Sequence, residues 1–201
     1  ANSPAPPHFP PGVPYCVANF AGFYGRDHGN DRGFPPDGFQ RTLWGLYPVG
    51  GKFDNDEKAK ISGANDGAQG QGIAPIWQPA FTDFVKAEDA LVIGTAGNAR
   101  TLLESAIRKS IATVVAFPVS AGVTVPANRV PSTAKIQQYV DKVLQLYDNA
   151  ASNDDKLNVI MKEYYIALWG NGIEAYNNCR RTGMPKNMQP NLNPSPGPFL
   201  R

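Results

Sequence analysis

The sequence has few of the residues that carry catalytic or metal-binding chemistry. It contains only 2 cysteines and 2 histidines in 201 residues, and 18% of its residues are charged against a usual ~25%. Lysine and arginine, 19 in all, nearly balance the 17 aspartates and glutamates, and no block of like charges occurs. These absences exclude a polybasic surface for nucleic acid or for an anionic membrane.

Long apolar runs are also absent. No stretch reaches the roughly 18 uninterrupted apolar residues of a membrane-spanning helix. Residues 1–14 lack the charged and apolar regions of a signal peptide. The spacing of Cys16 and Cys179 matches no metal or redox motif, so a disulfide between them and two free thiols both remain open.

What the sequence does contain is a globular composition with many chain-bending residues. Hydrophobic residues make up 42% of the chain and aromatic residues 10%, which favours one folded domain. The 20 glycines and 19 prolines follow no collagen-like period. We therefore expect much of the chain to form ordered loops.

These loop residues are unevenly distributed, which divides the chain into two regions. Residues 1–80 hold 13 of the 20 glycines and 11 of the 21 aromatic residues, without a sustained helical period. We expect this region to be rich in loops and to face a ligand. Residues 81–201 are expected to form helical hairpins followed by an extended C-terminal segment, in one structural unit with the first region.

Apolar residues recur at helical spacing through the second region. Thr82, Asn98 and Asn153 are suitable N-caps, and Gly183 followed by Pro185 is a suitable helix end. The apolar segment 117–131 is expected to be a packed loop. Five helices are predicted, at about 82–93, 98–115, 132–147, 153–169 and 173–182.

Two of the predicted helical hairpins have the length of tetratricopeptide-type pairs, about 34 residues each. Such arrays usually need about three pairs to be stable on their own, and residues 81–201 supply only two. The predicted fold class is all-α with extensive irregular loops.

The helical region also carries long motifs that resemble a known family. The run from Ile160 to Pro185, IMKEYYIALWGNGIEAYNNCRRTGMP, is similar to the C-terminal signature of SusD/RagB-like outer-membrane lipoproteins of Bacteroidetes. Upstream, FVKAEDAL (84–91) and GNARTLLESAIRKSI (97–111) resemble a helical hairpin of that family, in the same order. Residues 27–38 and 41–54 are similar to a loop segment of one subgroup.

The resemblance implies a helical scaffold beside an irregular, ligand-facing region. Members of the family are glycan-binding lipoproteins on the cell surface that cover a TonB-dependent SusC-like transporter, and they are neither enzymes nor cofactor-dependent. The family's N-terminal half is missing from the sequence, so we expect a C-terminal portion in which Cys16 is not the acylated residue. Its membrane attachment would come only through a lipid anchor on the missing part.

The loop-rich region contains the residue types that bind carbohydrate. Aromatic faces stack on the apolar side of a sugar ring, and polar side chains meet its hydroxyl groups. The alternative is that these aromatic side chains form a small core of the loop region. The candidate ligand-binding residues are Trp44, Tyr47, Trp77, Asp27, Asn30 and Arg41.

Other functions were weighed against glycan binding. A glycosidase would need two carboxylates across a cleft. The residue type is supplied by Asp27, Asp31, Asp37 and Asp54, but their spacing is not diagnostic. A cluster at 54–57 could bind Ca²⁺ but lacks EF-hand spacing, so a solvated acidic turn is favoured and no metal is expected. The last alternative is a helical scaffold that binds a partner protein.

One charge pair is predicted inside the family signature. Glu174 lies one to two turns before Arg180 and Arg181, which predicts a pair that stabilises the helices rather than a catalytic arrangement.

Overall fold

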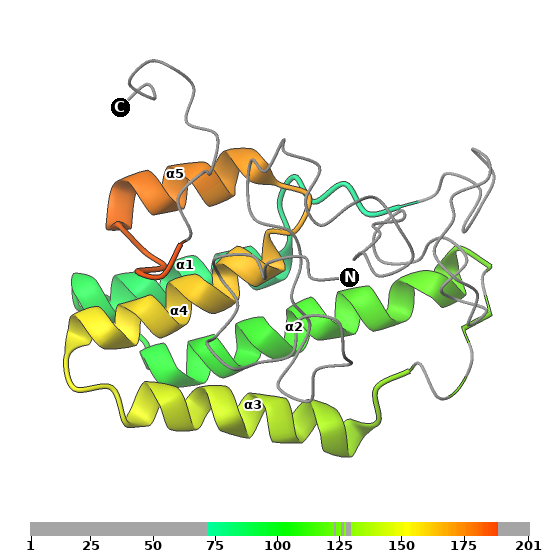
Figure 1. The fold of residues 1–201 in the computed structure, drawn as a ribbon, viewed down its shortest axis with the longest axis horizontal. Coiled ribbons are helices and arrows are strands. Elements are labelled where there is room, and N and C mark those ends of the chain that lie inside the picture. The colour runs from blue at the N-terminus through cyan, green and yellow to red at the C-terminus, as the bar shows by residue number, and fades with distance from the viewer. Residues whose placement is uncertain (1–71, 123, 126, 128–129, 189–201) are drawn as a thin grey trace, which may run out of the picture.

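The computed structural model describes residues 72–122, 124–125, 127 and 130–188. Over these residues the chain forms five helices and no strand, which confirms the predicted all-α class (Figure 1). The division into regions 1–80 and 81–201 stays a prediction, because residues 1–71 lie outside the described part. The helices are α1 (Pro79–Val92), α2 (Ala99–Ser120), α3 (Thr133–Asp148), α4 (Asn153–Ala167) and α5 (Gly172–Thr182).

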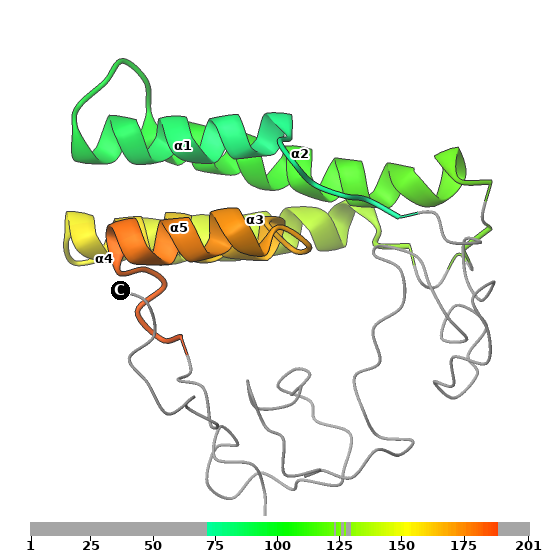
Figure 2. The same ribbon diagram turned by 90° about the horizontal axis from the view of Figure 1, so that it is seen from above.

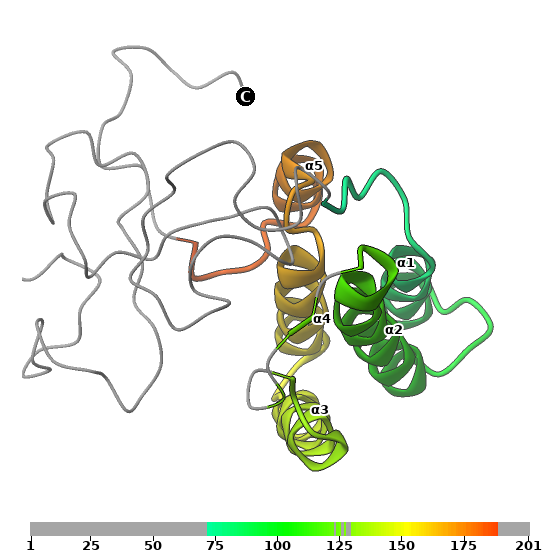
Figure 3. The same ribbon diagram turned by 90° about the vertical axis from the view of Figure 1, so that its right-hand side faces the viewer.

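The helices lie side by side in two layers (Figure 2). One layer contains α1 and α2, and the other contains α3, α4 and α5. Figure 3, seen nearly along the helix axes, shows α4 between α3 and α5. Helix α4 contacts α1, α2 and α3, and α2 likewise contacts α1, α3 and α4, so these two helices join the layers.

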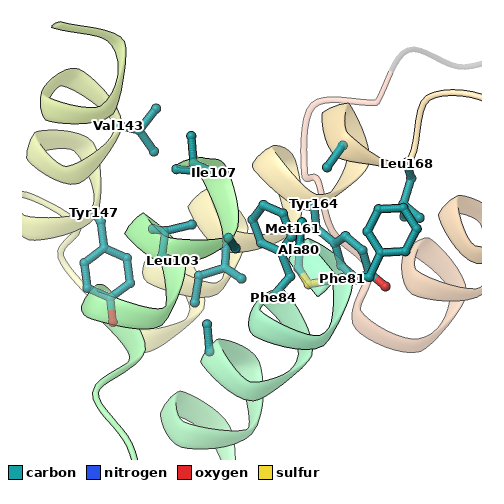
Figure 4. Close-up of a cluster of buried hydrophobic side chains, with 14 of the residues drawn as sticks. Ala80, Phe81, Phe84, Leu103, Ile107, Val143, Tyr147, Met161, Tyr164 and Leu168 are labelled. Carbon is teal, nitrogen blue, oxygen red and sulfur yellow. The ribbon is translucent and has the colours of Figure 1, made fainter. Parts of the chain in front are cut away.

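The core lies between the two layers (Figure 4). Phe81, Phe84 and Tyr164 are almost completely buried there, and the Phe84 and Tyr164 rings stack with centroids 5.1 Å apart. Phe81 meets Tyr164 at 5.6 Å in a tilted arrangement. These aromatic contacts join α1 to α4 and add ~1 kcal/mol each beyond the area they bury.

The predicted caps were partly right. Asn98 caps α2, with its side-chain oxygen accepting from the Thr101 amide at 3.0 Å, and Gly183 ends α5 in the left-handed conformation at φ 71°. Thr82 is not a cap, because α1 begins earlier at Pro79, a residue that suits a first turn without its own N–H. Asn153 is not the cap of α4 either, because the Ser152 hydroxyl accepts from the Asp155 amide at 3.1 Å.

The segment 117–131 was predicted to be a loop, but its first residues are helical. Helix α2 continues through Pro118 to Ser120. Proline removes only its own N–H, and the Ala121 amide still donates to the Phe117 carbonyl at 2.9 Å. No helix among the described residues has both the length and the apolar character needed to span a membrane.

Candidate functional site

Trp77 is the one predicted ligand-binding residue within the described part of the chain. It lies just before α1, and 55% of it is exposed. Its indole Nε1 donates to the Thr82 hydroxyl at 3.0 Å, and its ring meets Phe81 edge to face with centroids 6.0 Å apart. Because the indole N–H is already satisfied, Trp77 offers a ligand an apolar ring rather than a hydrogen bond.

Trp77 rests on the aromatic core. Phe81, beneath it, is fully buried and contacts Tyr164 of α4. Burial raises the pKa of the Tyr164 hydroxyl to about 12, so this group stays neutral at physiological pH. The exposed indole therefore packs against Phe81, which in turn packs against Tyr164, and both of these side chains are uncharged.

The backbone around Trp77 is tied to the turn between α4 and α5. The Asn171 side-chain amide donates to the carbonyl oxygens of Pro75 and Ile76, at 2.8 and 3.2 Å. The side-chain oxygen of Asn171 accepts from the Glu174 amide at 3.1 Å and so caps α5 as well. We call this set of hydrogen bonds the Asn171 clamp.

A glycine next to the clamp allows this close approach. Gly170 has φ +93°, a conformation that L side chains rarely adopt. A Cβ at Gly170 would also come within 3.3 Å of the Pro75 ring. The Gly170–Gly172 interruption, which in the sequence only marks a helix end, therefore brings the residues before α1 against the α4–α5 turn.

Several large apolar side chains are exposed around the clamp. Ile76 is 84% exposed and Ile173 is 74% exposed, and both flank clamp residues. We refer to these three exposed apolar residues, Trp77, Ile76 and Ile173, as the Trp77 surface. Exposed aromatic and aliphatic groups held on a rigid support suit contact with the apolar face of a ligand.

Charged groups at the C-terminal end of α5, the end away from the Asn171 clamp, hold helices together. Both guanidinium nitrogens of Arg181, in α5, contact the carboxylate of Glu88 in α1, and the Nη2 to Oε2 distance is 2.8 Å. Glu174 was predicted to pair with Arg180 or Arg181, and the structure gives Arg181 a different partner, Glu88. Arg180 lies over the Tyr176 ring, 5.7 Å from its centroid. The Arg181–Glu88 pair joins α5 to α1 and so links helices of the two layers.

The other predicted site residues lie outside the described part of the chain. These are Trp44, Tyr47, Asp27, Asn30 and Arg41, and their role in ligand binding stays a prediction. The aspartates weighed for glycosidase chemistry and the acidic residues 54–57 lie outside it as well. Within the described residues, no group of three or more His, Cys, Asp and Glu side chains could hold a metal ion.

Of the two cysteines, only Cys179 lies within the described residues. Cys179 carries a free thiol that is partly buried, and burial raises its pKa. A raised pKa lowers the fraction of reactive thiolate at neutral pH. Cys16 lies outside the described residues.

Sequence reasoning missed the residues that support Trp77. Asn171 is an ordinary helix cap in the sequence, and nothing in its spacing reveals two further bonds to a segment about a hundred positions earlier. The signal that could have indicated a special turn is the Gly-Asn-Gly motif at 170–172.

Comparison with known proteins gives a family match and one structural relative. Residues 53–199 match the model of the family described as SusD-like, Susd and RagB outer membrane lipoprotein. A solved structure described as "Bacteroidetes AC2a SusD-like" is similar with 26% sequence identity and a TM-score of 0.45, over 57% of this chain and 20% of that chain. The chain thus spans about a fifth of that relative's length. None of the curated proteins compared with the chain matches it.

Proposed function

The chain belongs to the SusD-like family of outer-membrane lipoproteins, and from this premise we propose that it is a non-catalytic glycan-binding component of an outer-membrane nutrient-uptake complex. In this proposal it binds an oligosaccharide at the cell surface and passes it to a TonB-dependent SusC-like transporter. The described part contributes a rigid helical support and the Trp77 surface. The loop residues Trp44, Tyr47, Asp27, Asn30 and Arg41 would supply further contacts.

The observation that carries the proposal is the state of Trp77. Its indole N–H is bonded internally to Thr82, while more than half of the residue is exposed. A tryptophan held in this way can stack on a sugar ring without reorienting. Such preorganisation limits the entropy lost on binding.

The test is a binding measurement on Trp77 variants of the full chain. A glycan array first identifies the oligosaccharide that binds most strongly, and calorimetry then measures its affinity. Trp77→Ala is expected to lower that affinity about fivefold, because an aromatic contact contributes ~1 kcal/mol beyond buried area. Trp77→Phe keeps a flat ring and should retain most of it.

Leu146→Ala, at an exposed position on α3, is the matched control and should bind normally. Circular dichroism should show the same helix content in all variants. If Trp77→Ala binds the oligosaccharide as the unchanged chain does, Trp77 is not part of the site.

The same protein distinguishes the alternatives. Sugar release from a panel of polysaccharides is expected to be nil, and turnover that disappears on changing Asp27 or Asp31 would establish a glycosidase instead. Co-purification with the transporter, together with no binding on the array, would favour a protein-binding scaffold.

A further inference from the structure

A concave site that Trp77 does not line lies among α2, α3 and α4, with Phe84 of α1 also in its lining. It is a pocket of about 310 Å³, at the small end of the ~300–1,000 Å³ range of small-molecule sites. Most of its lining is aliphatic, with Ile107 and Ile111 from α2, Ile136 from α3 and Ile166 from α4. An apolar group the size of a single ring would fit this volume.

One acidic side chain interrupts this apolar lining. Glu163 of α4 lines the pocket and is only 7% exposed. Its Oε2 accepts a hydrogen bond from the Tyr139 hydroxyl of α3 at 2.6 Å. A carboxylate can accept about four hydrogen bonds, so a single phenol leaves most of its capacity unused.

Glu163 has no ion-pair partner in the described part of the chain. Burial therefore raises the pKa of Glu163, while the Tyr139 hydrogen bond and the more distant charge of Lys162 lower it. Lys135 also lines the pocket, but its side chain is exposed and it is not among the groups that shift this pKa.

We propose that this pocket binds a small organic amine, with its hydrocarbon body among the isoleucines and its ammonium group against Glu163. A buried carboxylate is screened less by water than an exposed one, so it attracts an ammonium group more strongly than it attracts an uncharged group of the same shape. The apolar walls favour a compact ring or branched chain over a polar body such as a sugar. The site does not depend on the Trp77 surface or on glycan binding.

The probes are benzylamine and benzyl alcohol, which share a ring and differ in the charge of the head group. The chain is labelled at isoleucine δ1 methyl groups and titrated with each probe at neutral pH. We expect benzylamine to shift the methyl signals of Ile107, Ile111, Ile136 and Ile166. Ile93 and Ile173, exposed and outside the pocket, serve as internal controls.

The charge of Glu163 should make the affinities of the two probes different. Benzylamine should bind about tenfold more tightly than benzyl alcohol, the effect of one hydrogen bond to a charged group. In Glu163→Gln, which keeps the side-chain shape, this preference should disappear. Equal affinity for both probes, an unchanged preference in Glu163→Gln, or no shift at the four pocket methyls would overturn the proposal.

Tyr139→Phe provides an independent arm if Glu163→Gln does not fold. It removes the only hydrogen bond that the described residues give to Glu163 and leaves the carboxylate less satisfied. Benzylamine should then bind more tightly than to the unchanged chain, while benzyl alcohol should not. A fall in benzylamine affinity would contradict the assignment of Glu163 as its counter-charge.

Discussion

Asp83 in α1 and Glu163 in α4 are equally buried, each 7% exposed, but the two helix interfaces that hold them treat their charge differently. At the α1–α2 interface, the Lys109 ammonium and the Ser105 hydroxyl both reach Asp83 Oδ2 at 2.6 Å. At the α3–α4 interface, the Tyr139 hydroxyl is the one hydrogen-bond donor that the described residues offer to Glu163. Among the described residues, the buried carboxylate of the α1–α2 interface therefore has a cationic partner, whereas that of the α3–α4 interface has a neutral one.

The α1–α2 interface, which pairs its buried carboxylate with a cation, is also the more tightly packed of the two. Ala87 of α1 and Ala106 of α2 are fully buried, and small side chains allow helices to approach closely. The Ile136 side chain of α3 is only partly buried and lines the pocket. The comparison shows that this bundle has a closed side at α1–α2 and an open side at α3–α4.

The largest effect expected from this contrast is on packing. Leu103→Ala, at a fully buried position of α2, should lower the free energy of unfolding by about 3 to 5 kcal/mol. Ile136→Ala on the open side should cost about 1 to 2 kcal/mol, because its side chain already borders a pocket. Urea denaturation followed by circular dichroism measures both. Equal losses would remove the distinction between the two sides.

A smaller effect is expected from removing one cation. Lys109→Met leaves Asp83 buried with only Ser105 as partner, and should cost about 1 to 2 kcal/mol, because Lys109 itself is half exposed. Lys135→Met, at the rim of the pocket, is the control and should change stability by less than about 0.5 kcal/mol. If both variants unfold at the same denaturant concentration, the pair with Asp83 does not stabilise the closed side.

The smallest effect concerns pH. The contributions of Asp83 and Glu163 to the stability of the fold should change in opposite directions as pH rises. Burial alone would raise the pKa of Asp83, but the hydrogen bonds from Lys109 and Ser105 hold it below its ordinary value. Asp83 therefore stabilises the fold above its unfolded pKa, and this contribution is lost as pH falls through the folded pKa. Burial raises the pKa of Glu163, so its contribution is present below the unfolded pKa and lost as pH rises through the folded pKa.

Stability measured across the acidic range tests these signs. Relative to Asp83→Asn, the unchanged chain should gain stability as pH rises. Relative to Glu163→Gln, it should lose stability as pH rises. Parallel curves for both comparisons would mean that the two carboxylates have similar surroundings.

The helices could be predicted from the sequence because their apolar residues recur at a 3.6-residue spacing that survives in the bundle. Asn98 and Gly183 act within one helical turn, so their roles were also visible. The start of α1 was missed because Pro79 was not considered as a first-turn residue. The predicted end of α2 was too early, because segment 117–131 was expected to be a loop although α2 continues through Pro118 to Ser120.

Contacts between distant residues could not be predicted in this way. Arg181 was assigned to a neighbour on its own helix, whereas its partner Glu88 lies 93 positions away. Glu163 follows Lys162 as one of two adjacent charged residues between apolar runs, and their charge alone does not indicate that Glu163 is buried and Lys162 exposed. Of the predicted ligand-binding residues, only Trp77 is described, and the surface around it depends on the Asn171 clamp.

The Asn171 clamp also has a consequence for the order of folding. It joins residues 95 and 96 positions apart, so its loop can close at little entropic cost only after α1 to α4 have packed. We therefore expect the clamp to be absent from the folding transition state and to act as a latch that slows unfolding. Asn171→Ala should speed unfolding and leave the folding rate nearly unchanged.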